Sequence, residues 1–314
     1  MRAIVMKRFG DADVLRLGDV PDPEPRDGYH VVDVTLCGVN FADVHVRQNT
    51  YLTGIELPCT PGNEVVGRVD GRRVVALTPG GGYAEKTLVP QRTTWDVPDD
   101  ISDEHALVLA LQGNSAWHAL FTAGELAPGQ TVLIPAAAGG FGSLAVQMAH
   151  QAGARVIAMA GTEDKRSLAE ELGADAVVDS SSCDALTERI VKAAGGPVHI
   201  ALETGGGETF DQVLGAVAPG GRVVVYGQAC GQDAAVSTRA LIQKSITVAG
   251  FWLASQYADP TALSVSMAGL FGAVRSGLLR PVTGTTYPLG EAPQAHRDLQ
   301  ARRHSGKLAL DTSS

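Results

Sequence analysis

The feature that most constrains the fold is a glycine-rich turn between an apolar run and an amphipathic run. Residues 131–135 are predicted to form a buried strand and 140–152 a helix, with Ala137-Ala138-Gly139-Gly140-Phe141-Gly142 at their junction. Such a turn lets the backbone approach a pyrophosphate and points the unpaired N–H groups of a helix N-terminus at it. Ala137 stands where the G-x-G-x-x-G pattern has its first glycine, so a turn without a ligand remains the alternative.

This turn belongs to the first of several strand–helix units. After Leu107, apolar strands alternate with amphipathic helices. Beyond the first unit, the expected strands are 155–160, 176–178, 199–203, 222–226 and 246–253, and the expected helices are 163–172, 184–194 and 208–217. The alternation predicts a doubly wound parallel sheet and favours dinucleotide binding at the turn.

The rest of the chain follows a different pattern. Glycine and proline turns separate short alternating runs, which predicts a compact β-barrel with strands at 1–6, 30–36, 64–69, 73–77 and 83–89. A long helix is expected over 262–276. Short strands at 285–288 and 307–311 then return the chain to the barrel.

Charge and composition exclude several classes of function. The net charge of −9 and a pI near 5.3 argue against general nucleic-acid binding, while leaving room for a local basic pocket. No run approaches the ~18 apolar residues that a membrane span needs. The four cysteines are far apart, which predicts reduced thiols and no disulfide framework. The N-terminal segment lacks the apolar core of a signal peptide, so a cytoplasmic protein is expected.

The end of the second strand of the parallel sheet bears on the choice of dinucleotide. Sites for NAD usually place an acid there, where it binds the ribose 2′-hydroxyl. Residues 159–162 contain no acid, and Lys165 and Arg166 follow within one helical turn, where they can pair with a 2′-phosphate. Glu163 and Asp164 compete for these cations, and a solvated helix face is the plain alternative. NADPH is the favoured cofactor.

Short motifs occur from one end of the chain to the other. They are Val20-Pro21-Asp22-Pro23, Cys37-Gly38-Val39-Asn40-Phe41-Ala42-Asp43, Pro61-Gly62-Asn63-Glu64, Gly82-Tyr83-Ala84-Glu85, Ala116-Trp117, the glycine-rich turn, Leu172-Gly173-Ala174-Asp175, Ala295-His296 and Gly306-Lys307. Together they resemble the zinc-free quinone oxidoreductases of the medium-chain dehydrogenase/reductase superfamily. The resemblance implies a GroES-like β-barrel catalytic domain, residues 1–112 and 254–314, split around a Rossmann NADP(H)-binding domain, residues 113–253.

The resemblance also implies which residues hold the cofactor. Ser115 is expected near it, Gly227 is expected to let the backbone approach the nicotinamide, and Lys307 is expected to reach a phosphate. A helix-start serine and a surface lysine are the plain alternatives. Ser180 replaces a tyrosine that often contacts the NADPH phosphate in this family. The full expected set is Ser115, Ala138, Gly139, Gly140, Phe141, Gly142, Gly161, Thr162, Lys165, Ser180, Gly227, Phe251, Leu253 and Lys307.

The run 251–253 has a second interpretation. It is expected to line the nicotinamide pocket, but it is also apolar enough to be an edge strand that pairs across a homodimer. The stretches Gly62-Asn63-Glu64 and Gly250-Phe251-Trp252-Leu253 are more similar to the 2-enoyl thioester reductases of the same superfamily.

No metal is expected. Zinc members of the superfamily use a cysteine, the histidine of a Gly-His-Glu motif and a further cysteine. Cys37 matches the first ligand, but Asn63 replaces the histidine and residues 109–114 offer no thiol. Without zinc the hydride acceptor should already be activated, as quinones, enones and enoyl thioesters are. Their reduction spreads the negative charge, which hydrogen-bond donors then stabilise.

Three residues are candidates for catalysis. The resemblance implies that Asn40 faces the nicotinamide, where it orients the ribose or donates to the substrate oxygen. The alternative is that its side chain bonds to nearby backbone groups. Tyr51 matches the active-site tyrosine of the enoyl thioester reductases, or it is an amphipathic residue at a cleft rim. His45 is the third candidate, as a proton donor. Asp43 is expected to cap a short helix or to pair with Arg47.

The sequence therefore predicts an NADPH-dependent, zinc-independent oxidoreductase that transfers hydride to a quinone or an α,β-unsaturated carbonyl compound. An enoyl-thioester reductase is the alternative within this class. A non-catalytic NADPH-binding protein similar to the crystallin relatives, or a ketone reductase with a protein acid in place of zinc, is the alternative outside it. A small-molecule substrate and a homodimer are expected, with no nucleic-acid or membrane partner.

Overall fold

The structure, a computed structural model, describes residues 1–313 and divides them into two compact units. Unit 1 contains Met1–Gln112, Gln256–Gly277 and the C-terminal stretch from Pro281. Unit 2 contains Gly113–Ser255 and Leu278–Arg280. The predicted α/β class is confirmed, because one unit is built on a mainly antiparallel sheet and the other on a parallel one. Among the described residues, no helix has the length and apolar character needed to cross a bilayer.

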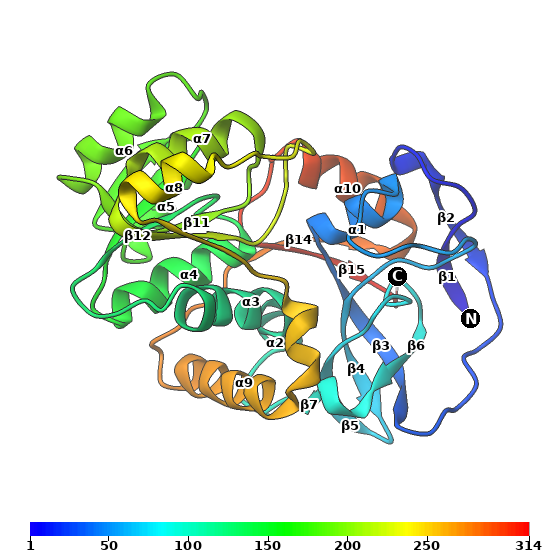
Figure 1. Ribbon diagram of the computed structural model, residues 1–314. Coiled ribbons are helices and arrows are strands. Elements are labelled where there is room, and N and C mark those ends of the chain that lie inside the picture. Colours follow the sequence, from blue (N-terminus) through cyan, green and yellow to red (C-terminus); the bar gives the residue numbers. More distant parts are fainter. Residues whose placement is uncertain (314) are drawn as a thin grey trace. The chain divides into compact units, whose positions relative to one another are not determined.

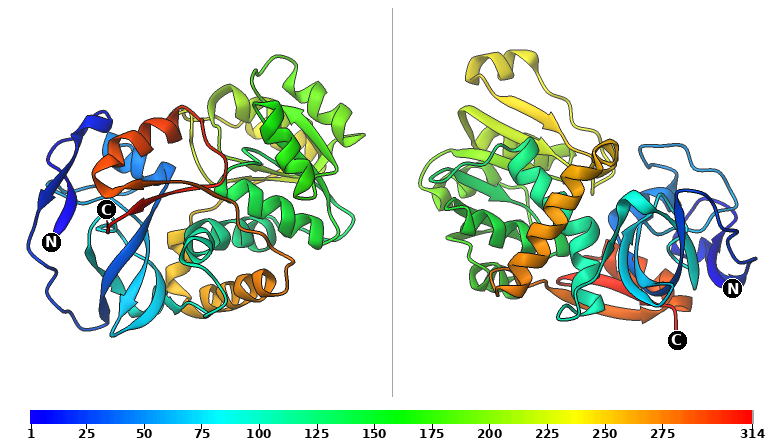
Figure 2. Two further views of the ribbon diagram at one scale, coloured as in Figure 1. Left: turned by 180° about the vertical axis from the view of Figure 1, so that it is seen from behind. Right: turned by 90° about the horizontal axis from the view of Figure 1, so that it is seen from below.

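Unit 1 is built around one large sheet. Its strands follow the order β14 (Thr283–Pro288), β15 (Lys307–Asp311), β3 (Tyr29–Val39), β4 (Glu64–Val69), β5 (Arg72–Leu77) and β7 (Thr94–Asp96), and β6 (Lys86–Pro90) also pairs with β3. A hairpin of β1 (Arg2–Met6) and β2 (Leu15–Asp19) stands apart from this sheet. The C-terminal strand β15 lies antiparallel to β3, as Figures 1 and 2 show. The predicted return of the chain to the first unit is therefore confirmed.

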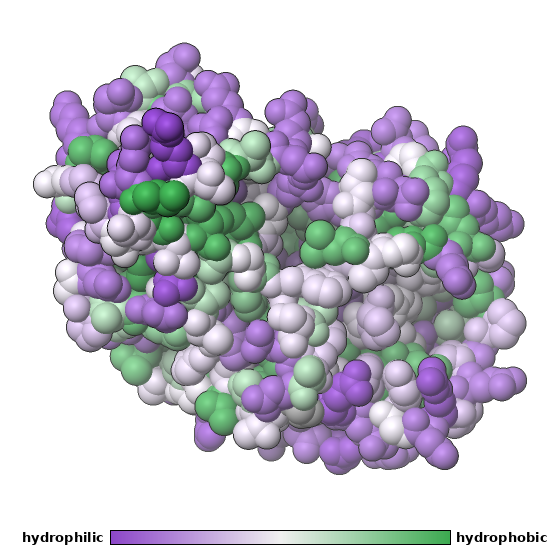
Figure 3. Space-filling model, in the orientation of Figure 1, coloured by the Kyte–Doolittle hydropathy of each residue, from purple (hydrophilic) through white to green (hydrophobic). Residues whose placement is uncertain are grey.

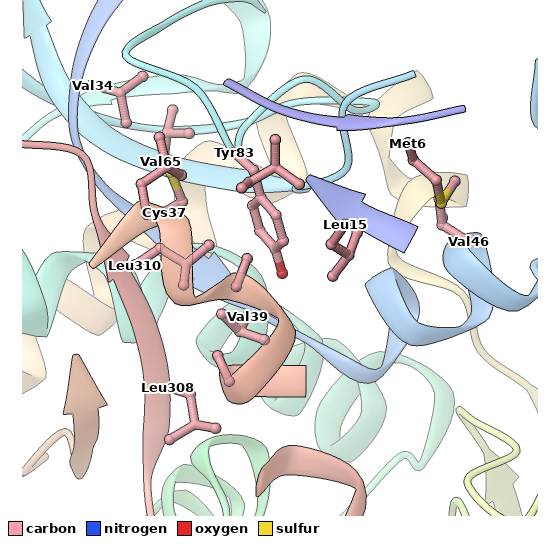
Figure 4. Close-up of a cluster of buried hydrophobic side chains, with 14 of the residues drawn as sticks. Met6, Leu15, Val34, Cys37, Val39, Val46, Val65, Tyr83, Leu308 and Leu310 are labelled. Carbon is pink, nitrogen blue, oxygen red and sulfur yellow. The ribbon is translucent and has the colours of Figure 1, made fainter. Parts of the chain in front are cut away.

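Four helices accompany this sheet. They are α1 (Phe41–Gln48), α2 (Asp103–Val108), α9 (Pro260–Arg275) and α10 (Ala292–Gln300). Sequence periodicity located α9 but not α2 or α10. The strand expected over 83–89 begins only at Lys86, because Tyr83 turns its side chain into the core instead of continuing the ladder. Figure 4 shows the Tyr83 ring among apolar side chains that include Met6, Leu15 and Cys37.

Unit 2 contains a six-stranded sheet in which every neighbouring pair is parallel. Its order is β10 (Ala176–Asp179), β9 (Arg155–Ala160), β8 (Thr131–Ile134), β11 (Val198–Glu203), β12 (Val217–Val225) and β13 (Thr247–Gly250). This is the doubly wound order 3-2-1-4-5-6, so the prediction of a parallel sheet is confirmed. The direction of winding reverses between β8 and β11, and ligands of such sheets bind beside that point, at the carboxyl ends of the strands.

Helices precede and connect the parallel strands. They are α3 (Asn114–Trp117), α4 (Gly140–Gln151), α5 (Glu163–Glu171), α6 (Leu186–Ala194), α7 (Gly207–Ala216) and α8 (Thr238–Lys244), and wider π-helical turns flank α3 at Leu109–Gly113 and His118–Ala123. The last strand was predicted over 246–253 but ends at Gly250. Leu253 instead begins a 3-10 turn that runs to Ala258.

A buried polar network links α1 and α10 to the loops that precede β4 and β6. The Tyr83 hydroxyl lies 3.0 Å from Asp43 Oδ2 and 3.1 Å from His296 Nε2. Asp43 also accepts the backbone N–H of Asn40 at 2.9 Å and that of Gly62 at 3.2 Å. Asp43 therefore caps α1 as predicted. Its suggested pairing with Arg47 does not form, since that guanidinium bonds to other partners, one of them the Gly10 carbonyl at 3.0 Å.

Burial shifts the ionisation of this network in two directions. Loss of water raises the pKa of Asp43 to about 7. Burial, together with the charge of Arg47, lowers the pKa of His296 to about 3. Burial and the Asp43 carboxyl raise the pKa of Tyr83 well above its usual value. At neutral pH the imidazole and the phenol are therefore both uncharged.

We expect His296→Gln to change how stability depends on pH. The folded pKa of His296 is about 3 against 6.5 for the free side chain, so the unfolded chain binds the extra proton. Wild-type stability therefore falls as the pH drops from 6.5 toward 3. Because the variant lacks this proton uptake, the stability advantage of the wild type should shrink by on the order of 2 kcal/mol from about pH 7 to about pH 5.

Urea unfolding at several pH values measures this difference. Asp43, whose pKa shift has the opposite sign, is present in both proteins and so largely cancels. His150→Gln, at an exposed histidine, is the control and should leave the pH dependence unchanged. A wild-type advantage that stays constant with pH would contradict the assignment.

Candidate active site

The glycine-rich turn of unit 2 has the geometry of a phosphate site. A side chain at Gly142 would place its Cβ 2.3 Å from the Ala136 carbonyl oxygen, so only glycine lets α4 pack this close to the turn. The first intrahelical bond is donated by Ser143 to the Gly139 carbonyl at 2.9 Å. The backbone N–H groups of Gly140, Phe141 and Gly142 precede that bond and point out of the start of α4. Three donors and the positive end of the helix dipole suit a pyrophosphate.

The ends of β9 and β10 bring together the residues predicted to hold the adenosine half. The Ser180 N–H bonds to the Ala160 carbonyl at 3.2 Å, which places Ser180 beside the end of β9. Gly161 and Thr162 are exposed there, and Lys165 is half-buried one helical turn further. Arg166 contacts Asp179 at 3.3 Å, so this cation already has an acidic partner. Lys165, one position earlier in the same helical turn, is the other cation that was expected to pair with a 2′-phosphate.

The remaining cofactor candidates apart from Lys307 lie in other parts of unit 2. The Phe251 N–H bonds to the Val225 carbonyl at 2.8 Å, so this residue lies beside the end of β12. Leu253 and Ser115 are both buried, the latter in α3. Gly227 has a further contact that the sequence did not indicate. A Cβ there would lie 2.3 Å from Thr204 Oγ1, so the missing side chain makes room for a threonine of this unit.

An aromatic stack that the sequence did not reveal also lies at this edge. The rings of Phe141 and Tyr226 are 4.1 Å apart at an interplanar angle of 14°. Phe141 belongs to the glycine-rich turn, and Tyr226 follows β12 directly. Nothing in the local pattern pairs two residues this far apart in the chain.

In unit 1, Asn40 is the centre of a buried polar cluster. Its Nδ2 donates to Glu64 Oε1 at 2.9 Å, and its Oδ1 accepts from Lys307 Nζ at 2.6 Å and from Gln112 Nε2 at 3.4 Å. Lys307 and Glu64 form an ion pair in which the side chains are 1% and 0% exposed. The backbone N–H of Leu111 donates to the other Glu64 oxygen at 3.0 Å.

This cluster corrects one prediction and sharpens another. Lys307 was expected to reach a cofactor phosphate, but its ammonium is enclosed between Glu64 and Asn40 and is committed to them. Asn40 is held by more than local backbone. The Asn40 oxygen accepts from Lys307, and one Nδ2 hydrogen is donated to Glu64. These two bonds fix the direction of the second Nδ2 hydrogen, which makes no hydrogen bond among the described residues. Such a fixed donor suits an oxygen on which negative charge develops.

The two candidate proton donors have different surroundings. Tyr51 packs against the apolar core of unit 1. His45 bonds through Nδ1 to Thr50 Oγ1 at 2.9 Å, and partial burial lowers its pKa, so it is mostly neutral near pH 7. Sequence reasoning missed a further phenol, Tyr257. Burial, with the charges of Tyr51 and Glu64 nearby, raises the pKa of Tyr257 well above its usual value.

The side chains at the zinc position do not fit that metal. The Cys37 thiol is buried and donates to the Gly82 carbonyl at 2.6 Å, and burial raises its pKa far above the usual value. Asn63 offers an amide in place of an imidazole. Within residues 1–313, no three His, Cys, Asp or Glu side chains gather in a group suited to a metal ion.

Comparison with known proteins agrees with this architecture. Residues 26–99 match the family described as alcohol dehydrogenase GroES-like domain, and residues 140–267 match the zinc-binding dehydrogenase family. The mouse quinone oxidoreductase-like protein 2 is 34% identical over 293 residues, which cover 89% of this chain and 83% of that protein. The rat quinone oxidoreductase is 30% identical over 325 residues, covering 99% of this chain and 97% of the relative.

Solved structures extend the comparison to the whole fold. The quinone oxidoreductase of Thermus thermophilus is 36% identical with a TM-score of 0.89, over 99% of this chain and 100% of that one. The Escherichia coli quinone oxidoreductase, solved in complex with NADPH, is 27% identical with a TM-score of 0.93 over the same shares of each chain. The chain therefore belongs to the medium-chain dehydrogenase/reductase superfamily and, within it, to the quinone oxidoreductase-like proteins.

Proposed function

We propose that this chain is an NADPH-dependent reductase that works without zinc and delivers hydride to a quinone. Relatives named quinone oxidoreductases match nearly the whole chain, and the Escherichia coli structure contains NADPH. The observation that carries the proposal is the fixed amide of Asn40. Its remaining N–H is a preorganised donor for an oxygen that becomes negative when hydride arrives.

The residues of unit 2 fit NADPH. The three N–H groups at the start of α4 would bind the pyrophosphate, and Gly142 keeps that helix close enough to the turn. Lys165 would pair with the 2′-phosphate beside Gly161, Thr162 and Ser180. No acid stands at the end of β9 to select a free 2′-hydroxyl. Bound NADPH would supply the hydride.

The residues of unit 1 determine which acceptors suit this chain. Because the side chains at the zinc position do not fit a metal ion, the developing charge depends on hydrogen-bond donors. Asn40 donates to the acceptor oxygen, while Lys307 and Glu64 prevent the amide from rotating away. Tyr51 is the candidate for a second bond to that oxygen, or for returning a proton to the product. An acceptor that delocalises the negative charge left by the hydride can be reduced without a stronger electrophile such as a metal ion.

A panel of acceptors tests this function. With NADPH in excess, purified protein should reduce benzoquinones and naphthoquinones, and should use NADH at least tenfold less efficiently in kcat/KM. Higher activity on enoyl thioesters would support the alternative of an enoyl-thioester reductase. Activity on saturated ketones would point to a ketone reductase, and NADPH binding without turnover on any acceptor to a non-catalytic protein. Each of these outcomes contradicts a quinone reductase.

Replacing Asn40 tests the proposed donor. Asn40→Ala removes the fixed N–H, and we expect kcat to fall about 10²- to 10³-fold, as for other preorganised donors to developing oxyanions. The dissociation constant for NADPH should change less than about threefold, because the phosphate turn lies in the other unit. Asn49→Ala, at the exposed end of α1, is the control and should keep wild-type kcat. An Asn40→Ala enzyme with normal kcat would remove Asn40 from the mechanism.

We also propose that the protein is a homodimer that pairs through β13. This strand has a neighbour on one side only, and the Ile242 side chain of the adjoining α8 is 78% exposed. Figure 3 shows apolar surface gathered at this part of unit 2. An unpaired strand edge beside apolar surface favours association.

Light scattering at micromolar concentration should give twice the chain mass, and Ile242→Lys should shift the measured mass toward that of the monomer. A monomeric wild type would contradict this proposal.

A further inference from the structure

We propose that Tyr226 is a positioning residue for NADPH, acting through its ring stack on Phe141. Phe141 is one of the residues whose backbone N–H faces the expected pyrophosphate, so its placement affects binding directly. Tyr226 contributes no such group, and it precedes the loop that was expected to approach the nicotinamide. The inference rests on the proposed use of NADPH, and it assigns a role to a residue that the sequence did not single out.

The stack has close and nearly parallel geometry. The ring centroids lie 4.1 Å apart, and the planes differ by 14°. Contact of this kind adds to the attraction from burial alone and restricts the side-chain torsions of both residues. Phe141 is the second residue of α4. Fixing its ring therefore restrains the first helical turn, which carries all three N–H groups expected to bind the phosphates.

The stack also crosses the point where the direction of winding reverses. The sheet order is β8, β11, β12, and the Tyr226 N–H bonds to the Glu203 carbonyl at the end of β11 at 2.9 Å. From that position its ring reaches over the end of β11 to the turn that follows β8. The stack thus ties the second half of the sheet to the phosphate turn, at the crevice where the dinucleotide must lie.

A second set of contacts holds Tyr226 itself. The Thr204 side chain lies beside it and fills the space left by the missing side chain of Gly227. This arrangement gives Gly227 a structural reason that the sequence could not supply. Burial, with Glu203 nearby, raises the pKa of Tyr226 far above its usual value. The phenol thus stays uncharged beside the phosphate site at any pH at which the enzyme would work.

Loss of the ring should therefore weaken NADPH binding without changing the chemistry. Tyr226→Leu removes the stack, and the dissociation constant for NADPH should rise about three- to tenfold, the range expected for one aromatic pair. At saturating NADPH, kcat should stay within about twofold of wild type, because no group at the acceptor has changed. Tyr226→Phe keeps the ring and should restore binding to within about twofold.

A double-mutant cycle tests whether Tyr226 acts through Phe141. The dissociation constant for NADPH is measured by fluorescence titration for wild type, Tyr226→Leu, Phe141→Leu and the double variant. If the stack is the route, the second substitution adds little to the first. Phe121→Leu, which breaks the edge-to-face pair of Phe121 with Trp117 in the same unit, is the matched control and should leave binding unchanged.

The possible outcomes separate this inference from the proposed function. If the wild type fails to bind NADPH, the proposed function fails. If the wild type binds and Tyr226→Leu binds equally well, Tyr226 has no positioning role. Effects of the two single substitutions that simply add would also overturn the inference, since Tyr226 would then act by another route. Weaker binding in Tyr226→Phe would assign the effect to the hydroxyl and not to the stack.

Discussion

The buried ion pair of Lys307 and Glu64 is the interaction on which the candidate active site depends. Removing two charges from water is costly, and their attraction offsets the cost only where the remaining polar atoms are also satisfied. Here Asn40 bonds to both charged groups, and the Leu111 N–H bonds to the second Glu64 oxygen. Because Lys307 comes from the last strand and Glu64 from β4, the amide of Asn40 is fixed only after the two ends of the chain have met.

In unit 2 the corresponding constraint is the presence of glycine at two positions where no side chain fits. A Cβ at Gly142 or at Gly227 would lie 2.3 Å from a neighbouring oxygen. At Gly142 that space brings the helix dipole to the turn, and at Gly227 it admits the side chain of Thr204. Two glycines that look alike in the sequence therefore serve different contacts, one to backbone and one to a side chain. Only the packing around each glycine distinguishes them.

Sequence periodicity predicted the parts of the fold in which local pattern and burial agree. The strand at 64–69 and the helix that follows the glycine-rich turn were located within a residue of their observed bounds. The helix α10 was missed, although its His296 was noted. Its buried residues Ala292, Ala295, His296 and Leu299 have helical spacing, but only one of these four side chains is large and apolar. The roles of Glu64, Gln112 and Tyr226 were missed for a deeper reason. Each depends on a partner far away in the chain, and no local spacing encodes that contact.

The protonation of the buried groups bears on the choice of acceptor. Burial raises the pKa of Tyr83 and Tyr257, so these phenols hold their protons near pH 7. Burial lowers the pKa of His45, so this imidazole is mostly neutral and has no extra proton to donate. Asp43, with a pKa of about 7, is enclosed by its own hydrogen bonds. Reduction of an enone ends with a proton placed on carbon, which calls for a positioned acid. Reduction of a quinone ends on oxygen, where water can supply the proton. With Tyr51 as the one remaining candidate acid, a fixed hydrogen-bond donor favours the proposed quinone over an enone.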